Sequence, residues 1–202
     1  FLIKEGILNE TEVENLKDQY KKEISEAFDV ALKFDDIPVG KEKELADLYA
    51  PFDQVITEPS ATKKDMRLVD AIAEAMDMAM EKHPNLTLMG QDIADYGGVF
   101  KITDGLMAKY GKHRVRNTPL CESAILGAAL GLSIKSRKAM MEMQFADFAS
   151  TGFNQIVNNL AKIHWRWGQN ADVVIRMPTG AGVGAGPFHS QSNEAWFFHT
   201  PG

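Results

Sequence analysis

The pattern of hydrophobic and polar positions separates a polar N-terminal third from a more apolar remainder. After Asn9, apolar residues recur at helical spacing, and Glu12 stands where a capping box places a glutamate. We therefore predict a helical arm over residues 1–33 whose apolar stripe rests on another surface: Val13, Leu16, Tyr20, Ile24, Ala27, Ala31 and Leu32. From 34 to 64, Pro, Gly and Asp interrupt every apolar run, which predicts a linker with a short helical turn around Lys43–Tyr49.

From residue 65 to 202 the pattern alternates between apolar runs of strand length and stretches with helical periodicity. This alternation predicts an α/β fold, a mainly parallel sheet covered by helices on both faces. The expected helices are Leu68–Lys82, Thr103–Tyr110, Glu122–Ile134 and Phe148–Ile163, and the expected strands are Leu86–Met89, Val115–Asn117, Ala139–Met143 and Val173–Met177.

Composition narrows the class of protein. The 202 residues are 45% hydrophobic and 25% charged, with a net charge of -6, which argues against a nucleic-acid or anionic-membrane partner. No apolar run is long enough for a membrane span or a signal peptide. The single cysteine, Cys121, fits a reducing compartment, and we expect a cytoplasmic protein. The chain begins with Phe1, so we expect it to be processed or excised from something longer.

The first candidate for chemistry is Glu122, which follows a predicted strand and turn. Among the next ten residues only Ser123 is polar, so we expect the helix to be buried all round and Glu122 to lie near the core edge. A partly buried carboxylate is an acid/base candidate. The alternative is a first-turn acid favoured by the helix dipole.

Two further segments carry candidate residues. Gln144 and Phe148 follow the carboxyl end of a predicted strand, where open α/β sheets place ligands. The alternative is that the aromatic residues here belong to the core and that Asp147 caps the next helix. The glycine-rich stretch 180–186 is an incomplete nucleotide-binding fingerprint, and we interpret it as a mobile loop that exposes His189. The five histidines lack metal-ligand spacing, so no metal site is predicted.

Together these segments resemble one family, the β subunit of the thiamine diphosphate-dependent E1 component of 2-oxo acid dehydrogenases, and most of all its branched-chain members. The resemblance runs from about Met66 to Gly202 and rests on Leu88-Met89-Gly90-Gln91-Asp92, Tyr96-Gly97-Gly98-Val99-Phe100-Lys101, Thr118-Pro119-Leu120-Cys121-Glu122, Gln144-Phe145-Ala146-Asp147-Phe148, His189-Ser190-Gln191-Ser192 and Glu194-Ala195-Trp196-Phe197-Phe198-His199-Thr200-Pro201-Gly202. Residues 1 to about 50 are similar to the tail of the E1 α subunit. This similarity implies a fused α–β polypeptide, a bacterial arrangement.

The resemblance assigns roles to particular residues. Glu122, Gly127 and Gly131 match the spacing of the thiamine-enzyme motif, although Lys135 replaces the Gln that often follows. It implies that Glu122 donates a hydrogen bond to N1′ of the cofactor aminopyrimidine. Phe148 would lie against the pyrimidine ring, and Leu120 and Gln144 beside the cofactor. His189 would assist transfer of the acyl group to the lipoyl domain of E2.

The resemblance also implies what lies outside this sequence. Residues 65–202 would be the transketolase-like pyrimidine-binding domain, truncated at its C-terminus. No Gly-Asp-Gly motif occurs, so Mg²⁺ and the diphosphate would be held by the α-type half, and a second protomer would complete the enzyme. We therefore expect these 202 residues alone to be inactive.

Three alternatives stay open at this stage: a transketolase-like thiamine enzyme, a non-catalytic interaction domain, and nucleotide binding by the glycine-rich loop. The 2-oxo acid substrate also stays open between pyruvate, branched-chain and related acids.

Overall fold

The computed structural model describes all residues, Phe1–Gly202, and divides the chain into two compact units, Phe1–Lys41 and Glu42–Gly202. The first unit contains helix α1 (Glu10–Ala31), and its cap is the predicted capping box. The side-chain Oδ1 of Asn9 accepts from the backbone N–H of Glu12 at 2.9 Å, and the backbone N–H of Asn9 donates to the Glu12 carboxylate at 2.7 Å. These two bonds satisfy N–H groups that the first turn leaves unpaired. No residue of α1 is buried within its own unit.

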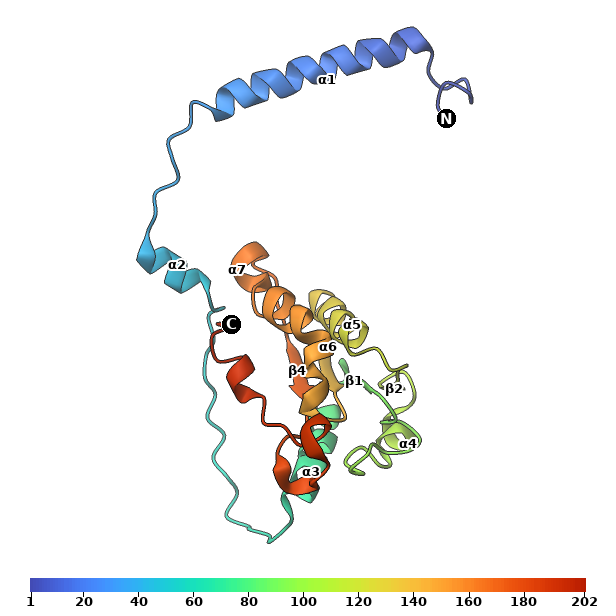
Figure 1. Cartoon of the computed structure of the whole chain (residues 1–202), viewed down its shortest axis with the longest axis vertical. Coiled ribbons are helices and arrows are strands. Elements are labelled where there is room, and N and C mark those ends of the chain that lie inside the picture. The colour runs from blue at the N-terminus through green and yellow to red at the C-terminus, as the bar shows by residue number, and fades with distance from the viewer. The chain divides into compact units, whose positions relative to one another are not determined.

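The second unit is built on a four-stranded sheet, coloured from green to orange in Figure 1. Its strands are β1 (Leu86–Gly90), β2 (Val115–Asn117), β3 (Lys138–Glu142) and β4 (Val173–Arg176), in the order β2-β1-β3-β4. Every pairing is parallel, so all strands end at the same edge of the sheet. The prediction of an α/β fold with a parallel sheet is confirmed.

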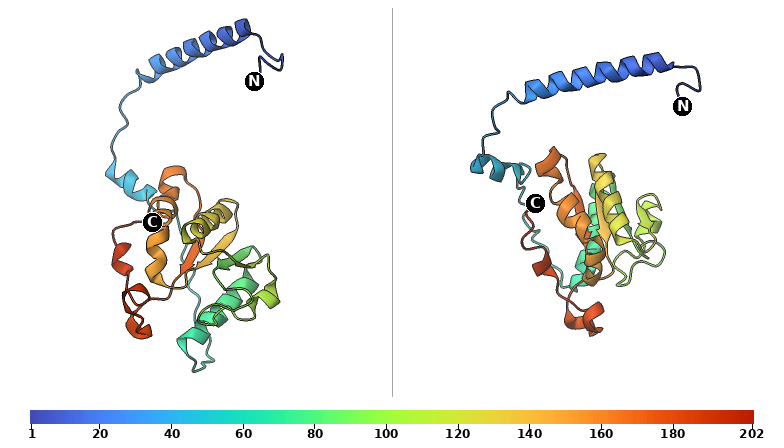
Figure 2. Two further views of the ribbon diagram at one scale, coloured as in Figure 1. Left: turned by 45° about the vertical axis from the view of Figure 1, so that its right-hand side comes forward. Right: turned by 45° about the horizontal axis from the view of Figure 1, so that its top comes forward.

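Helices cover both faces of this sheet, as predicted. Helices α3 (Leu68–Lys82) and α4 (Leu106–Tyr110) pack with Leu88 of β1 in one buried cluster. Helices α5 (Glu122–Ile134) and α6 (Ala149–Asn154) pack with Met89 in the other. Because successive side chains of a strand point to opposite faces, Leu88 and Met89 assign the two clusters to opposite sides. Figure 2 shows α5 and α6 side by side.

Several element boundaries differ from the prediction. The expected helix Phe148–Ile163 is wrong as one element: it is a 3₁₀ turn (Ala146–Phe148), α6, a π-helical turn (Gln155–Leu160) and, after a short break, α7 (Ile163–Trp167). Helix α4 begins at Leu106 rather than Thr103, because Gly105 has a φ of 76° and interrupts the helical path. Hydrophobic periodicity marks a helical face but not its changes of pitch.

The region between the arm and the α/β core contains one short helix, α2 (Lys41–Asp47). From there to α3 the chain forms no helix or strand. Helix α2 corresponds to the helical turn predicted around Lys43–Tyr49 and lies two residues earlier. None of the helices is both long and apolar enough to cross a bilayer.

Candidate functional site

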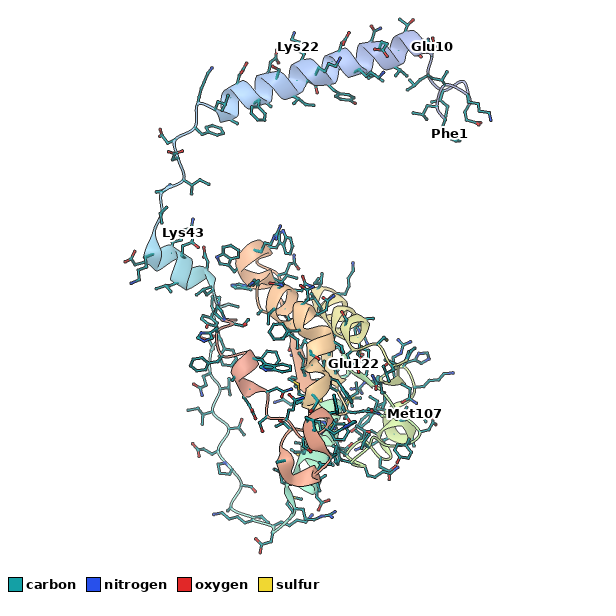
Figure 3. All side chains as sticks on the ribbon, viewed as in Figure 1. Phe1, Glu10, Lys22, Lys43, Met107 and Glu122 are labelled. Atoms are coloured by element: carbon teal, nitrogen blue, oxygen red, sulfur yellow. The ribbon has the colours of Figure 1, made fainter.

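Glu122 lies at the start of α5, where Figure 3 labels it. Its side chain is buried, with 6% of its surface exposed, and the Gln91 side-chain amide donates to its Oε1 at 3.2 Å. Gln91 is itself buried and directly follows β1. The amide thereby occupies one carboxylate oxygen and leaves Oε2 as the oxygen available to a ligand.

An open depression of about 440 Å³ adjoins Glu122. Its lining residues come from the start of α5 and from the segment 151–155: Cys121, Glu122, Ser123, Ala124, Gly127, Thr151 and Gln155. Helix α5 is therefore not buried all round, and that prediction is wrong. Ala124, Ala128 and Gly131 are exposed, because only one side of α5 packs on β3 and α6 and no element of this unit covers the other side.

Gln144 lies just beyond the end of β3. Like Glu122, it is hydrogen-bonded to a residue of the turn that follows β1. Its side-chain amide donates to Oδ2 of Asp92 at 3.2 Å. Asp92 has a φ of 57°, a left-handed conformation that is uncommon for a residue other than glycine. Its carbonyl also accepts from the backbone N–H of Gly98 at 2.8 Å. Thus the consecutive residues Gln91 and Asp92 bind Glu122 and Gln144, which lie on different elements.

Phe148 and His189 contact each other. The His189 ring lies 4.8 Å from the Phe145 ring and 5.4 Å from the Phe148 ring, measured between centroids, and is edge-on to both. Such edge-to-face pairs are favourable aromatic geometries. His189 is half-buried, so the prediction that the loop exposes this histidine is wrong. The glycine-rich stretch before it is mostly exposed, and only short 3₁₀ turns follow its glycines.

Asp147 does not cap the helix that follows it, which corrects the alternative interpretation of this residue. No side chain caps α6. Instead, Oδ1 of Asp147 accepts from the backbone N–H of Gln191 at 3.2 Å, forty-four positions along the chain. This bond links the segment that carries Phe148 to the segment that carries His189.

Leu120 lies in the turn before α5 and has 79% of its surface exposed. Leu120 is not part of the buried cluster that α5 and α6 form with Met89. The structure therefore joins Glu122 and Gln144 to consecutive residues after β1, places Phe148 against His189, and leaves Leu120 exposed in the turn before α5.

Sequence reasoning missed a buried ion pair at the same edge. Glu142 ends β3 and Arg176 ends β4, and their side chains form an ion pair with 3% and 16% of their surfaces exposed. Their opposite charges on adjacent strand ends were the available signal. Gln91 and Asp92 could have been found in the same way, because both directly follow β1. No cluster of three or more His, Cys, Asp or Glu side chains is arranged to hold a metal ion.

With this geometry in place, comparison with known families identifies the fold. Residues 64–202 match the pyrimidine-binding domain of transketolase. The chain belongs to the transketolase pyrimidine-binding domain family. The family match covers the whole sheet and every predicted site residue.

Individual relatives of this pyrimidine-binding domain are E1 β subunits. The chain is 45% identical over 148 residues to the mitochondrial 2-oxoisovalerate dehydrogenase subunit beta of Dictyostelium discoideum, covering 72% of this chain and 40% of that protein. It is 42% identical over 139 residues to the 2-oxoisovalerate dehydrogenase subunit beta of Bacillus subtilis, covering 68% and 42%.

A pyruvate dehydrogenase E1 component subunit beta, from Leifsonia xyli, is 36% identical over 149 residues, covering 73% of this chain and 44% of that protein. The pyrimidine-binding domain chain thus spans about two fifths of the length of these relatives.

Proposed function

We propose that this chain is part of a thiamine diphosphate-dependent 2-oxo acid dehydrogenase E1 component, which decarboxylates a 2-oxo acid and transfers the acyl group to lipoyl-E2. The observation that carries the proposal is the buried Glu122 carboxyl group. It is held by Gln91 and opens on a depression, in a domain of the family that binds the pyrimidine half of thiamine diphosphate.

The chemistry of the predicted site residues suits an aminopyrimidine ring. Oε1 of Glu122 is occupied by the Gln91 amide, so a proton on Oε2 can be donated to a ring nitrogen. Phe148 offers a half-buried aromatic face, and Gln144 a side-chain amide held by Asp92. Bound thiamine diphosphate would supply the electron sink that makes decarboxylation possible.

Each remaining site residue has a role that its position supports. We propose that Glu122 holds and donates the proton that activates the cofactor. Leu120 and Gln144 would lie beside the cofactor, and Phe148 would pack against its pyrimidine ring. The exposure of Leu120 is expected for an apolar side chain that another domain covers. His189 would hold or donate a proton during acyl transfer to the lipoyl group.

We further propose that the parent protein is a bacterial, cytoplasmic fused α–β polypeptide, because residues 1 to about 50 resemble an E1 α tail. Its α-type half would bind Mg²⁺ and the diphosphate, a second protomer would complete the site, and the lipoyl domain of E2 would be the partner. The domain limits 1–33, 34–64 and 65–202 belong to this proposal. Of the possible substrates, branched-chain 2-oxo acids are favoured by the 2-oxoisovalerate dehydrogenase relatives.

The decisive test is Glu122→Gln in the complete E1, assayed for lipoamide reduction with its E2, Mg²⁺ and thiamine diphosphate. Loss of a positioned acid/base group lowers turnover by about 10²–10⁴-fold. The matched control is Glu81→Gln, which makes the same change on the exposed end of α3 and should leave turnover unchanged. Unchanged turnover of Glu122→Gln would instead favour a non-catalytic interaction domain.

Two measurements separate the remaining alternatives. A transketolase-like enzyme would transfer a ketol group and give no lipoamide reduction, so the same assay distinguishes it. Calorimetry of the 202 residues with Mg²⁺ and thiamine diphosphate should show no tight binding, because the proposed diphosphate ligands lie in the α-type half. Micromolar binding would contradict that division of the site.

A further inference from the structure

The segment that carries His189 is a closed loop whose two ends are bonded together. The carbonyl of Gln191 accepts from the Thr179 hydroxyl at 2.8 Å and from the backbone N–H of Gly180 at 3.1 Å. The side-chain amide of Asn193 donates to the carbonyl of Ala146 at 2.8 Å. The part of the loop between these ends, over residues 181–188, is exposed and carries glycine at three positions: Gly182, Gly184 and Gly186.

Asp147 reaches this loop at the point where the loop closes. Asp147 has 8% of its surface exposed, and its Oδ1 accepts from the N–H of Gln191, the residue whose carbonyl closes the loop. Oδ2 is buried and accepts no hydrogen bond. A buried carboxylate with one acceptor bond contributes little to stability, because desolvation offsets most of what the bond supplies. Its place in the structure is better explained by what it positions.

The residues around Asp147 contact His189 directly. Phe145 and Phe148 form the two aromatic contacts to the His189 ring, and Asp147 lies between them in the chain. His189 is two residues before Gln191. One short segment therefore contacts the loop twice, at the His189 ring through the two phenylalanines and at the backbone of Gln191 through the Asp147 carboxylate.

We propose that Asp147 is a positioning residue that fixes His189 for acyl transfer by anchoring the backbone of Gln191. This inference rests on the proposed function for the role of His189, but the anchor itself is a property of this chain. Without the anchor, the aromatic contacts and the bonds from Thr179 and Gly180 to the Gln191 carbonyl would remain, and the glycines that precede His189 would let the loop move within those limits. Misplacement of a catalytic group by about 1 Å can lower a rate by roughly 10²-fold.

The anchor is tested first by amide hydrogen exchange in the full chain. Asp147→Ala removes the acceptor, so exchange of the Gln191 amide should accelerate about tenfold or more, the effect of losing a hydrogen bond to a charged group. Asp147→Asn keeps a side-chain oxygen at the same place and should retain most of the protection. Unchanged exchange in Asp147→Ala, or equal loss in both variants, would refute the anchor whatever the enzyme does.

The consequence for catalysis is tested in the complete E1 by separating its two half-reactions. Asp147→Ala should lower acylation of the E2 lipoyl domain by about 10–100-fold, while decarboxylation measured with an artificial electron acceptor changes by less than about threefold. His189→Ala in parallel should show the same selective loss. If His189→Ala lowers transfer and Asp147→Ala does not, the positioning role is refuted. If His189→Ala leaves transfer unchanged, the proposed role of His189 fails, and the catalytic part of this inference fails with it.

Discussion

Gly152 of α6 provides a test of how tightly α5 and α6 are packed beside Glu122. A Cβ atom at Gly152 would lie well inside 3.0 Å of Cδ1 of Leu126 and 3.4 Å from Cε of Met143. Both side chains are fully buried, so neither can move aside freely. Overpacking of this kind costs about 1–3 kcal/mol. For a domain of this size, about 2 kcal/mol corresponds to a fall in Tm of roughly 4–8 °C.

The assay is urea unfolding of Gly152→Ala followed by circular dichroism, with Gly131→Ala as the matched control. Gly131 lies on the exposed face of α5, and a Cβ there meets nothing within 4 Å, so its replacement should stabilise the chain by up to about 1 kcal/mol. In a Leu126→Ala background the penalty of Gly152→Ala should largely disappear, because the obstructing side chain is gone. An equal penalty in both backgrounds, or none in either, would refute the proposed clash.

Three further predictions concern polar contacts that do not involve the predicted site residues. Either Glu142→Gln or Arg176→Met should lower the free energy of unfolding by about 3–5 kcal/mol, since each leaves the other charge buried and unpaired. Replacing both residues by Met should lower the free energy of unfolding by less, and a larger loss in the double variant would be inconsistent with this explanation. Arg114→Ala should destabilise the chain by about 2–4 kcal/mol in urea unfolding, because its guanidinium donates to three carbonyls around the end of α3 and the start of β1, and Arg114→Lys should restore only part of the loss. Hydrogen bonds from Lys109 and Tyr110 hold the pKa of Asp77 below its usual 3.8, so this carboxylate stabilises the fold above about pH 4 and the stabilisation is lost as the pH falls through the lowered value. The difference in unfolding free energy between wild type and Asp77→Asn, measured at a series of pH values, should therefore shrink below about pH 4. A difference that does not change with pH would argue against this linkage.

Much of the fold could be predicted because its signals are local. The bounds of α3 and α5 agree with the predicted helices. In α3 the apolar positions recur at helical spacing and Pro84 follows its end, whereas α5 is a continuous run of small and apolar residues after a turn. The four strands were placed within one residue at each end, and their alternation with helices predicted the parallel sheet. The burial of Glu122 followed from the apolar sequence after it, although the exposed face of α5 did not.

The contacts that organise the candidate site could not be predicted in this way. The bond from Gln91 to Glu122 spans 31 positions, and the bond from Gln191 to Asp147 spans 44. Neither is encoded in a local spacing, because the order of strands in the sheet decides which loops meet at its carboxyl edge. The half-buried position of His189 could not be predicted either. The glycines before it predict an exposed loop, whereas Phe145 and Phe148, which contact its ring, lie more than forty positions earlier in the sequence.

Local sequence was enough to predict the arm, the alternation of helices and strands, and the carboxylate at the head of α5, because each depends on residues within a few turns of one another. The groups that surround that carboxylate follow from the packing of the whole fold. The order β2-β1-β3-β4 places β1 between β2 and β3, so the turn after β1 can reach both Glu122 and Gln144. It also brings the ends of β3 and β4 together, and with them Asp147 and the loop of His189. Long-range pairing of strands, rather than local preference, therefore assembles the site.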